Sequence, residues 1–419
     1  MSAIMSVRHT FIGALAGGVA AVTLAAMPVG AKAAGDTITL GAAVSFTGKY
    51  ATNGTHTKNG YDLAIKRVNE MGGVNVGGKK YKLAIKYYDD ESTPARGAQL
   101  AERLIKQDGV KFMLGPYSSG MTKAMAPIAE KYKIPMVEGN GASRSLFNKG
   151  YKYLFAVLST SEQYLAEAIN LAAQNAGKLG KKPDQLTVAL AMQNDPFSQD
   201  IRAGVLSDIK RYKMKVVIDD KLPKELNDMT VTLTKVKALK PDLLIVSGHS
   251  KGAALAIRQV AAMKVDTAML AMTHCEAAKV QDKFPKKSDY TLCATQWAET
   301  MSYKDKWFGT AKQYADRFRK AYPDYTVIPY QAAESSASVL VYVNAFKRAG
   351  SLDTKKVRDA LAATNLQTFY GNVKFAPTGQ NIAKPMALRQ IINGKYVVVA
   401  PAKWAESPVV FPKPKWSQR

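Results

Sequence analysis

One stretch of the sequence, residues 114–143, restricts the possible folds more than any other. The apolar, partly β-branched run 110–114 that leads into it is typical of a buried strand. A Gly-Pro turn ends that run, and a helix is expected over 120–131 because Ser is a preferred residue at a helix start. A second apolar run at 134–137 predicts a second strand. This order predicts two parallel strands joined by a crossover helix.

Both predicted strands end in turns that carry hydroxyl groups. Ser118 and Ser119 follow the first strand, and Ser143 follows the second. The carboxyl ends of parallel strands meet at one edge of a sheet, where ligands of open α/β folds bind. Backbone N–H groups and serine hydroxyls at a helix start suit a carboxylate or another small anion. Each serine alone is explained as a helix cap, but the two turns together favour a shared binding site.

The rest of the chain continues this alternation of strands and helices. Before the opening stretch we expect strands at 37–44 and 81–88 and helices at 59–71 and 94–107. A second alternating set begins near residue 161, with helices at 161–176, 200–212, 229–238 and 253–263, and strands at 186–192, 215–218, 243–246 and 268–272. The pattern predicts two doubly wound parallel sheets, each covered by helices on both faces.

The last third of the chain is expected to return to both sets. It reads as helices, a β-hairpin region and closing strands, at 304–321, 331–349, 355–363, 370–381 and 386–399. Two α/β lobes with several chain crossings predict a cleft between the lobes and a multi-strand hinge. The expected domains are a signal peptide at 1–33, lobe I at 34–157 plus 296–366, lobe II at 158–295 plus 367–405, and a C-terminal tail at 406–419.

The N-terminus reads as an export signal. Arg8 and His9 precede an apolar run at 11–27, and residues 31–33 offer the small side chains that signal peptidase requires. We expect cleavage after Ala33 and a periplasmic mature protein. The apolar run is too short and too rich in Gly and Ala to predict a membrane span.

The chain is strongly basic, with a formal net charge of +26 over 419 residues. The lysines and arginines are dispersed, and the sequence contains no basic stripe interleaved with aromatic residues. This distribution argues against nucleic-acid binding and favours a solvated basic surface. A bias toward anionic solutes or an anionic membrane surface stays open.

The only two cysteines, Cys275 and Cys293, are expected to form a disulfide in an oxidising compartment. A metal site is the weaker alternative, because His274 adjoins Cys275 but the spacing matches no zinc pattern. We expect no cofactor and no metal.

An enzyme is the main alternative to a binding protein. Residues 248–252 fit G-x-S-x-G between a strand and a helix, the context of a nucleophile elbow centred on Ser250. A serine hydrolase also needs an acid and a histidine after the serine. Only His274 follows, one helix and one strand later, whereas the histidine of α/β-hydrolases comes near the end of the domain. A helix N-cap is the preferred interpretation of Ser250.

The order of these segments resembles one family over essentially the whole mature chain. The carriers are TITLGAAVSFTGKYATNG, GYDLAIKRVNEMGGVNVGGKKYKLAIKYYDDES, GPYSSGMTKAMAPIAEKYKIPMVEGNGAS and YGNVKFAPTGQN. They are similar to periplasmic solute-binding components of ABC importers, in the branched-chain amino acid (Leu/Ile/Val-binding) group. The resemblance implies a type I periplasmic-binding fold without catalysis. It also implies a monomer that captures an amino acid or related small carboxylate and delivers it to an ABC permease of the inner membrane.

The resemblance also implies a ligand site in lobe I. In the family, the turn after the fourth strand binds the ligand carboxylate, and here that turn is Tyr117, Ser118 and Ser119. The following turn supplies a carbonyl, an N–H and a hydroxyl, positions that fall on Asn140, Ala142 and Ser143. Asn53 stands where relatives often carry an aromatic residue.

Lobe II departs further from the amino acid binders. Phe197 and His249 stand where those proteins carry tyrosines. The acid that holds the ligand ammonium falls near Thr273 or His274, with Glu276 just beyond. Because a neutral histidine is a poor partner for an ammonium, amine-free carboxylates, such as aromatic ones, and short amides are the alternative solutes.

Overall fold

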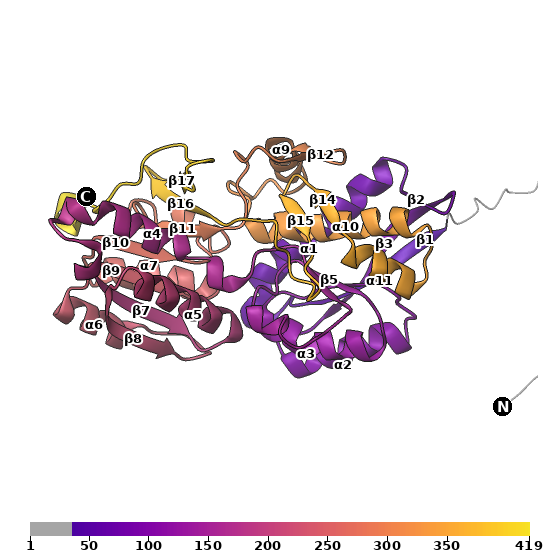
Figure 1. The fold of residues 1–419 in the computed structure, drawn as a ribbon, viewed down its shortest axis with the longest axis horizontal. Helices are drawn as coiled ribbons and strands as arrows, with labels where there is room; N and C mark the ends of the chain where they lie inside the picture. The colour runs from indigo at the N-terminus through magenta and orange to yellow at the C-terminus, as the bar shows by residue number, and fades with distance from the viewer. Residues whose placement is uncertain (1–35) are drawn as a thin grey trace, which may run out of the picture. The chain divides into compact units, whose positions relative to one another are not determined.

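The computed structural model describes residues 36–419, and the predicted signal peptide lies outside the described residues. Two sheets dominate the fold (Figure 1). The first has the order β2-β3-β1-β4-β5-β6, with strands at Val74–Val76, Lys79–Asp89, Thr37–Val44, Met113–Leu114, Met136–Glu138 and Leu154–Ala156. All neighbouring pairs are parallel except β2 and β3, which are antiparallel.

The second sheet has seven strands in the order β17-β16-β11-β10-β9-β7-β8. They span Lys395–Ala400, Ala387–Ile392, Leu292–Thr295, Met269–Met272, Leu243–Ser247, Thr187–Gln193 and Lys215–Leu222. The strands from β7 to β11 are parallel, while β16 and β17 are antiparallel additions at one edge. The predicted α/β class with two doubly wound sheets is confirmed.

Amphipathic helices pack on these sheets. In α2 the buried positions Gly97, Leu100, Ala101 and Leu104 recur every three or four residues, which places them on one face. Helix α2 packs against α3, and α1 packs against α10. The α-helices are, in chain order, α1 Ala51–Glu70, α2 Pro94–Lys106, α3 Ser119–Lys131, α4 Ala166–Asn175, α5 Pro196–Arg211, α6 Thr230–Leu239, α7 Ser250–Ala262, α8 Val280–Lys283, α9 Ala311–Ala321, α10 Tyr330–Ala349 and α11 Thr354–Ala362.

The chain crosses between the two sheets after β6, after β11 and before β16. Buried polar groups tie these crossings together. The Gln296 side-chain amide donates to the carbonyl of Ser159 at 3.0 Å, and the Ser159 hydroxyl donates to the carbonyl of Lys384 at 2.6 Å. These bonds link all three crossings at one point of the structure.

Two sequence predictions need correction. Residues 304–310 are not helical: they form a hairpin of β12 (Lys304–Asp305) and β13 (Gly309–Thr310) before α9 begins. Asp305 accepts two backbone N–H groups at 2.8 Å inside this hairpin, and Thr310 caps α9. In the predicted hairpin region, β15 (Asn372–Lys374) pairs with β14 (Asn365–Gln367), which lies upstream of the predicted segment.

The C-terminal tail packs against the loop between α7 and β10 and has no helix or strand until a short 3-10 turn at Trp416–Gln418. The Trp416 indole donates to the carbonyl of Val265 at 2.9 Å, and the Lys413 N–H donates to the carbonyl of Ala268 at 2.9 Å.

Candidate functional site

Both sheets share one strand order, which defines the place of the site. When only the parallel strands are numbered in chain order, each sheet has the order second, first, third, fourth, fifth. Each sheet therefore has a switch point between its first and third parallel strands. These switch points lie between β1 and β4 and between β7 and β9. Ligands of doubly wound folds bind at the carboxyl ends of the strands beside such points. The segments 115–119, 194–197 and 248–250 follow strands β4, β7 and β9, which flank the two switch points.

Residues from these turns line one cavity of about 10 Å³, which is room for about one water molecule. Its lining comes from both sheets and from α10: Tyr117, Ser118, Ser119, Asn140, Tyr164, Phe197, His249, His274, Tyr330, Gln331 and Glu334. A larger groove of about 620 Å³ lies beside Lys49, Asn227 and Ser250. We place the site in the smaller cavity because both switch points and the unpaired polar groups described below meet there.

The start of α3 provides the anion-binding end of the cavity. Ser118 is its N-cap, with φ 86° and ψ 146°, and its hydroxyl accepts from the N–H of Met121 at 3.4 Å. Such a rare backbone conformation for a non-glycine residue is typical of functional sites. The Ser119 hydroxyl accepts from the N–H of Ser143 at 2.9 Å. This bond joins the two serine-bearing turns that were expected to lie at one edge of the sheet.

Tyr117 connects the two sheets across the cavity. Its hydroxyl lies 2.7 Å from Nδ1 of His249 and 2.8 Å from Nε2 of His274. Burial lowers the pKa of His274 well below its ordinary value, and the nearby His249 lowers it further, so His274 is neutral. Asp195 lies 3.7 Å from Nε2 of His249. Although burial opposes ionisation of Asp195, His249 and the bonds from Ser198 hold the pKa of that carboxyl below its usual range.

A continuous aromatic wall surrounds the other end of the cavity. Ring centroids of Tyr164 and Phe197 are 5.1 Å apart, those of Tyr164 and Tyr330 are 6.2 Å apart, and those of Phe197 and His274 are 5.3 Å apart. Most pairs meet edge to face, the arrangement that aromatic quadrupoles favour. The wall is suited to an apolar ligand body or to a cation on the ring faces.

Unpaired polar atoms point to a ligand. Both amide atoms of Gln331 and the Oδ1 atom of Asn140 are buried and have no hydrogen-bond partner among the described residues. Gln331 is 1% exposed and Asn140 is 6% exposed. Buried polar groups are nearly always hydrogen-bonded, and each unpaired one costs about 1–3 kcal/mol. These atoms match a bound molecule that supplies both a donor and an acceptor.

Seven predicted site residues line this cavity: Tyr117, Ser118, Ser119, Asn140, Phe197, His249 and His274. Four do not. Asn53 accepts from the Ser250 hydroxyl at 2.5 Å, Ala142 accepts from the N–H of Ser161 through its carbonyl, and the Ser143 hydroxyl donates to Asp200. These three residues tie neighbouring segments together beside the cavity.

Glu276, the fourth of these residues, pairs through its carboxylate with the Arg389 guanidinium of β16, and the side chains are 0% and 7% exposed. It does not line the cavity, and its role as the partner of an ammonium stays a prediction.

Sequence reasoning missed Tyr164, Tyr330, Gln331 and Glu334. Three of them lie on the first turns of α10, in which 16 residues are buried. The sequence signal that could have found them is polar: Gln331 and Glu334 interrupt a helix of small and apolar residues, and buried Gln and Glu are uncommon unless paired.

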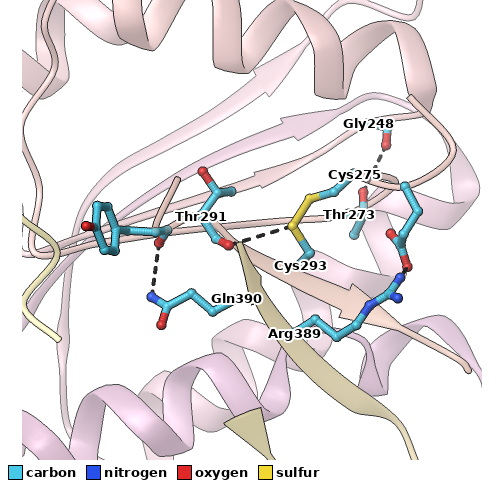
Figure 2. Close-up of a disulfide and its surroundings, with 9 residues drawn as sticks. Gly248, Thr273, Cys275, Thr291, Cys293, Arg389 and Gln390 are labelled. Carbon is cyan, nitrogen blue, oxygen red and sulfur yellow. Dashed lines mark hydrogen bonds and ion pairs between the residues drawn. A yellow bond between two sulfur atoms is a disulfide. The ribbon is translucent and has the colours of Figure 1, made fainter. Parts of the chain in front are cut away.

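Cys275 and Cys293 form the predicted disulfide, with Cα atoms 5.9 Å apart (Figure 2). It joins the turn after β10 to β11. The turn is held further by the Thr273 hydroxyl, which donates to the carbonyl of Gly248 at 2.9 Å. His274 lies between these anchors with φ 62°, in the left-handed region. The disulfide therefore helps to fix a histidine that lines the cavity.

The geometry does not assemble a serine hydrolase. The Ser250 hydroxyl donates to Asn53, and within residues 36–419 no hydrogen bond joins it to a histidine. The same part of the chain contains no group of three His, Cys, Asp or Glu side chains that could hold a metal. Among the described helices none is long and apolar enough to cross a membrane.

Comparisons with known proteins agree with this architecture. The profile of the family described as "Periplasmic binding protein" matches residues 37–395. A Leucine-, isoleucine-, valine-, threonine-, and alanine-binding protein of Pseudomonas aeruginosa is 24% identical over 347 residues, which cover 83% of this chain and 87% of that protein. A Leu/Ile/Val-binding protein homolog 7 of Brucella abortus is 22% identical, covering 94% of this chain and 98% of its own length.

Solved structures show the same fold. LivJ of Streptococcus pneumoniae in complex with isoleucine superposes with a TM-score of 0.75 at 23% identity, covering 87% of this chain and 100% of that one. A solute-binding protein of an ABC transporter from R. palustris in complex with benzoate superposes with a TM-score of 0.73 at 19% identity, covering 90% and 98%. With the type I fold and the profile match in place, the chain belongs to the periplasmic binding protein family, whose members bind small solutes for ABC transporters.

Proposed function

We propose that this protein captures a small carboxylate in the cavity between its two sheets and delivers it to an ABC permease in the inner membrane. The observation that carries this proposal is the junction of Ser119 with Ser143 at the start of α3, opposite histidines from the other sheet. Free N–H groups and hydroxyls at a helix N-terminus favour an anion. Family membership implies a periplasmic location.

Capture requires opening, because the described cavity holds about one water molecule. The two lobes that we propose to move are built on the first and the second sheet, and the third crossing between them lies near Lys384. Solute binds the first through Ser118 and Ser119, and the second closes over it with Phe197, His249 and His274. Closure excludes water, which strengthens charge-assisted hydrogen bonds to the carboxylate. The ligand's preference for the closed form then sets the population that the permease meets.

Two solute classes fit this mechanism: amino acids, and carboxylates without an amine. Known relatives of the fold are described with isoleucine and with benzoate. We also propose that the protein acts as a monomer and that catalysis is not part of its function.

The test is Ser119→Ala. Loss of a hydroxyl that holds a buried carboxylate weakens binding by about 1–3 kcal/mol, or roughly 5- to 150-fold in Kd. The matched control is Ser207→Ala, an exposed serine on α5. Titration calorimetry with the best carboxylate of a panel gives both affinities. Equal affinity in the Ser119 variant and the wild type overturns the proposed role of this turn.

A further inference from the structure

Glu334 is a buried acid at the cavity, separate from the residues proposed to bind the carboxylate. It lies on the second turn of α10, is 1% exposed, and lines the same cavity as Ser118 and Ser119. The Tyr370 hydroxyl donates to its Oε2 at 3.1 Å. It comes from a different element than Glu276, the acid that the sequence suggested.

The carboxyl group of Glu334 lacks an oppositely charged hydrogen-bond partner within residues 36–419. Among the described residues Glu334 forms no ion pair. The nearby cation Lys384 instead donates to the carbonyl of Gln296 and lies 4.2 Å from the centroid of the Tyr370 ring. Burial raises the pKa of Glu334 well above its ordinary value, opposed by Tyr370 and Lys384 and supported by the acids Glu138 and Glu276. A carboxyl in this setting gains the most from a cation brought in with the ligand.

The surroundings of Glu334 suit a cation. Tyr164 and Tyr330 line the cavity with it, and ring faces attract ammonium groups. Gln331, three residues earlier on α10, has a buried Oε1 acceptor without a partner. An ammonium has three donors and no acceptor, so a carboxylate, an amide oxygen and ring faces together match its chemistry.

We propose that Glu334, with Gln331 and the rings of Tyr164 and Tyr330, binds the ammonium group of the solute. The solute is then a zwitterion, an amino acid or a close relative, and not an amine-free carboxylate. This inference rests on the proposed function, in which the Ser119 turn takes the carboxylate. Glu334 lies on α10, which packs against the first sheet, whereas the acid that the resemblance implies falls near His274 in the second.

The experiment compares matched pairs on the mature protein after unfolding and refolding have removed bound solute. The pairs are alanine and propanoate, leucine and 4-methylpentanoate, and phenylalanine and 3-phenylpropanoate. Calorimetry is expected to show at least one amino acid that binds at least 100-fold more tightly than its deaminated partner. Glu334→Gln is expected to reduce that ratio at least tenfold, while the exposed control Glu70→Gln keeps it.

The outcomes separate the two claims. Deaminated acids that bind as tightly as amino acids overturn the ammonium site and leave the proposed function standing. An unchanged ratio in a folded Glu334→Gln variant also overturns the ammonium site and leaves the proposed function standing. Glu334 would then serve only to favour the charged form of Lys384. Absence of binding by both members of every pair overturns both claims. The wild-type comparison needs no variant, so a variant that fails to fold does not block the test.

Discussion

The hydroxyl of Tyr117 lies 2.7 Å from Nδ1 of His249, and this bond joins the turn after β4 to the turn after β9. The same hydroxyl lies 2.8 Å from Nε2 of His274. A phenol can donate one hydrogen bond and accept another. The hydroxyl can therefore bond to both histidines at once, and Asp195 faces the other ring nitrogen of His249 at 3.7 Å. One side chain thus contacts two turns of the opposite sheet.

Replacing Tyr117 by Phe removes both bonds and leaves two buried ring nitrogens unpaired. We expect the closed form to lose about 1–3 kcal/mol. Small-angle scattering of the ligand-free protein should then show a larger radius of gyration than the wild type. Tyr87→Phe is the control, because it removes the bond to Asp62 within the first sheet's own layers. Identical scattering curves for wild type and Tyr117→Phe would refute the linking role.

The disulfide is expected to stabilise the chain and to support binding. It spans a sequence separation of 18 residues, and a loop of that size corresponds to about 3 kcal/mol of unfolding free energy. The double variant Cys275→Ala, Cys293→Ala should lose about 2–4 kcal/mol in urea unfolding. Because His274 adjoins the bridge, the affinity of the double variant for solute should also fall. Unfolding that matches the wild type would contradict the structural role of the disulfide.

His56 should make stability depend on pH. It is buried, its ring nitrogens lie 2.7 Å from the Tyr325 hydroxyl and 3.1 Å from the Ala277 carbonyl, and burial lowers its pKa to about 4. Nearby Lys279 and Lys283 act in the same direction. Between about pH 6.5 and pH 4 the unfolded chain binds a proton that the folded chain does not. Stability from this group is therefore complete above pH 6.5 and is lost as pH falls toward 4.

The measurement is urea unfolding of wild type and His56→Gln at pH 7 and pH 4.5. The other titrating groups are common to both proteins, so the difference isolates His56. We expect the wild type to lose about 2–3 kcal/mol more than the variant on acidification. Equal losses would show that this histidine does not titrate as the burial implies.

Ser250 should behave as a contact residue and not as a nucleophile. Ser250→Ala removes the bond to Asn53, which costs about 1 kcal/mol. Hydrolysis of a p-nitrophenyl ester should stay at the buffer rate in both the wild type and the variant. Turnover by the wild type that disappears in Ser250→Ala would revive the hydrolase hypothesis.

The alternation of strands and helices could be predicted because apolar residues recur with a different period in strands and in helices. The turns around Ser119 and Ser143 were readable too, because hydroxyl groups follow two consecutive strands and the strand ends must meet. Pairing of the cysteines followed from their number and the expected compartment. These features depend on short-range pattern and on general rules of α/β topology.

The rest depended on packing between distant segments. Helix α10 is buried on nearly all sides, so no amphipathic stripe indicates that Gln331 and Glu334 face the cavity. Glu276 pairs with Arg389, which lies 113 residues later in the sequence, so no local pattern indicates where its carboxylate lies. The misplaced helix start near residue 304 had a local signal, the capping box of Thr310 and Gln313.

The proposed function is tested most directly by asking whether the solute needs its carboxylate. The mature protein, freed of bound solute, is titrated calorimetrically with leucine, alanine, phenylalanine and benzoate, and with the amide of each, in which an uncharged carboxamide replaces the carboxylate. We expect that at least one carboxylate binds and that its amide binds far more weakly, because the Ser119 turn loses its anion. An amide that binds as tightly as its acid, or no binding by any carboxylate, would contradict it.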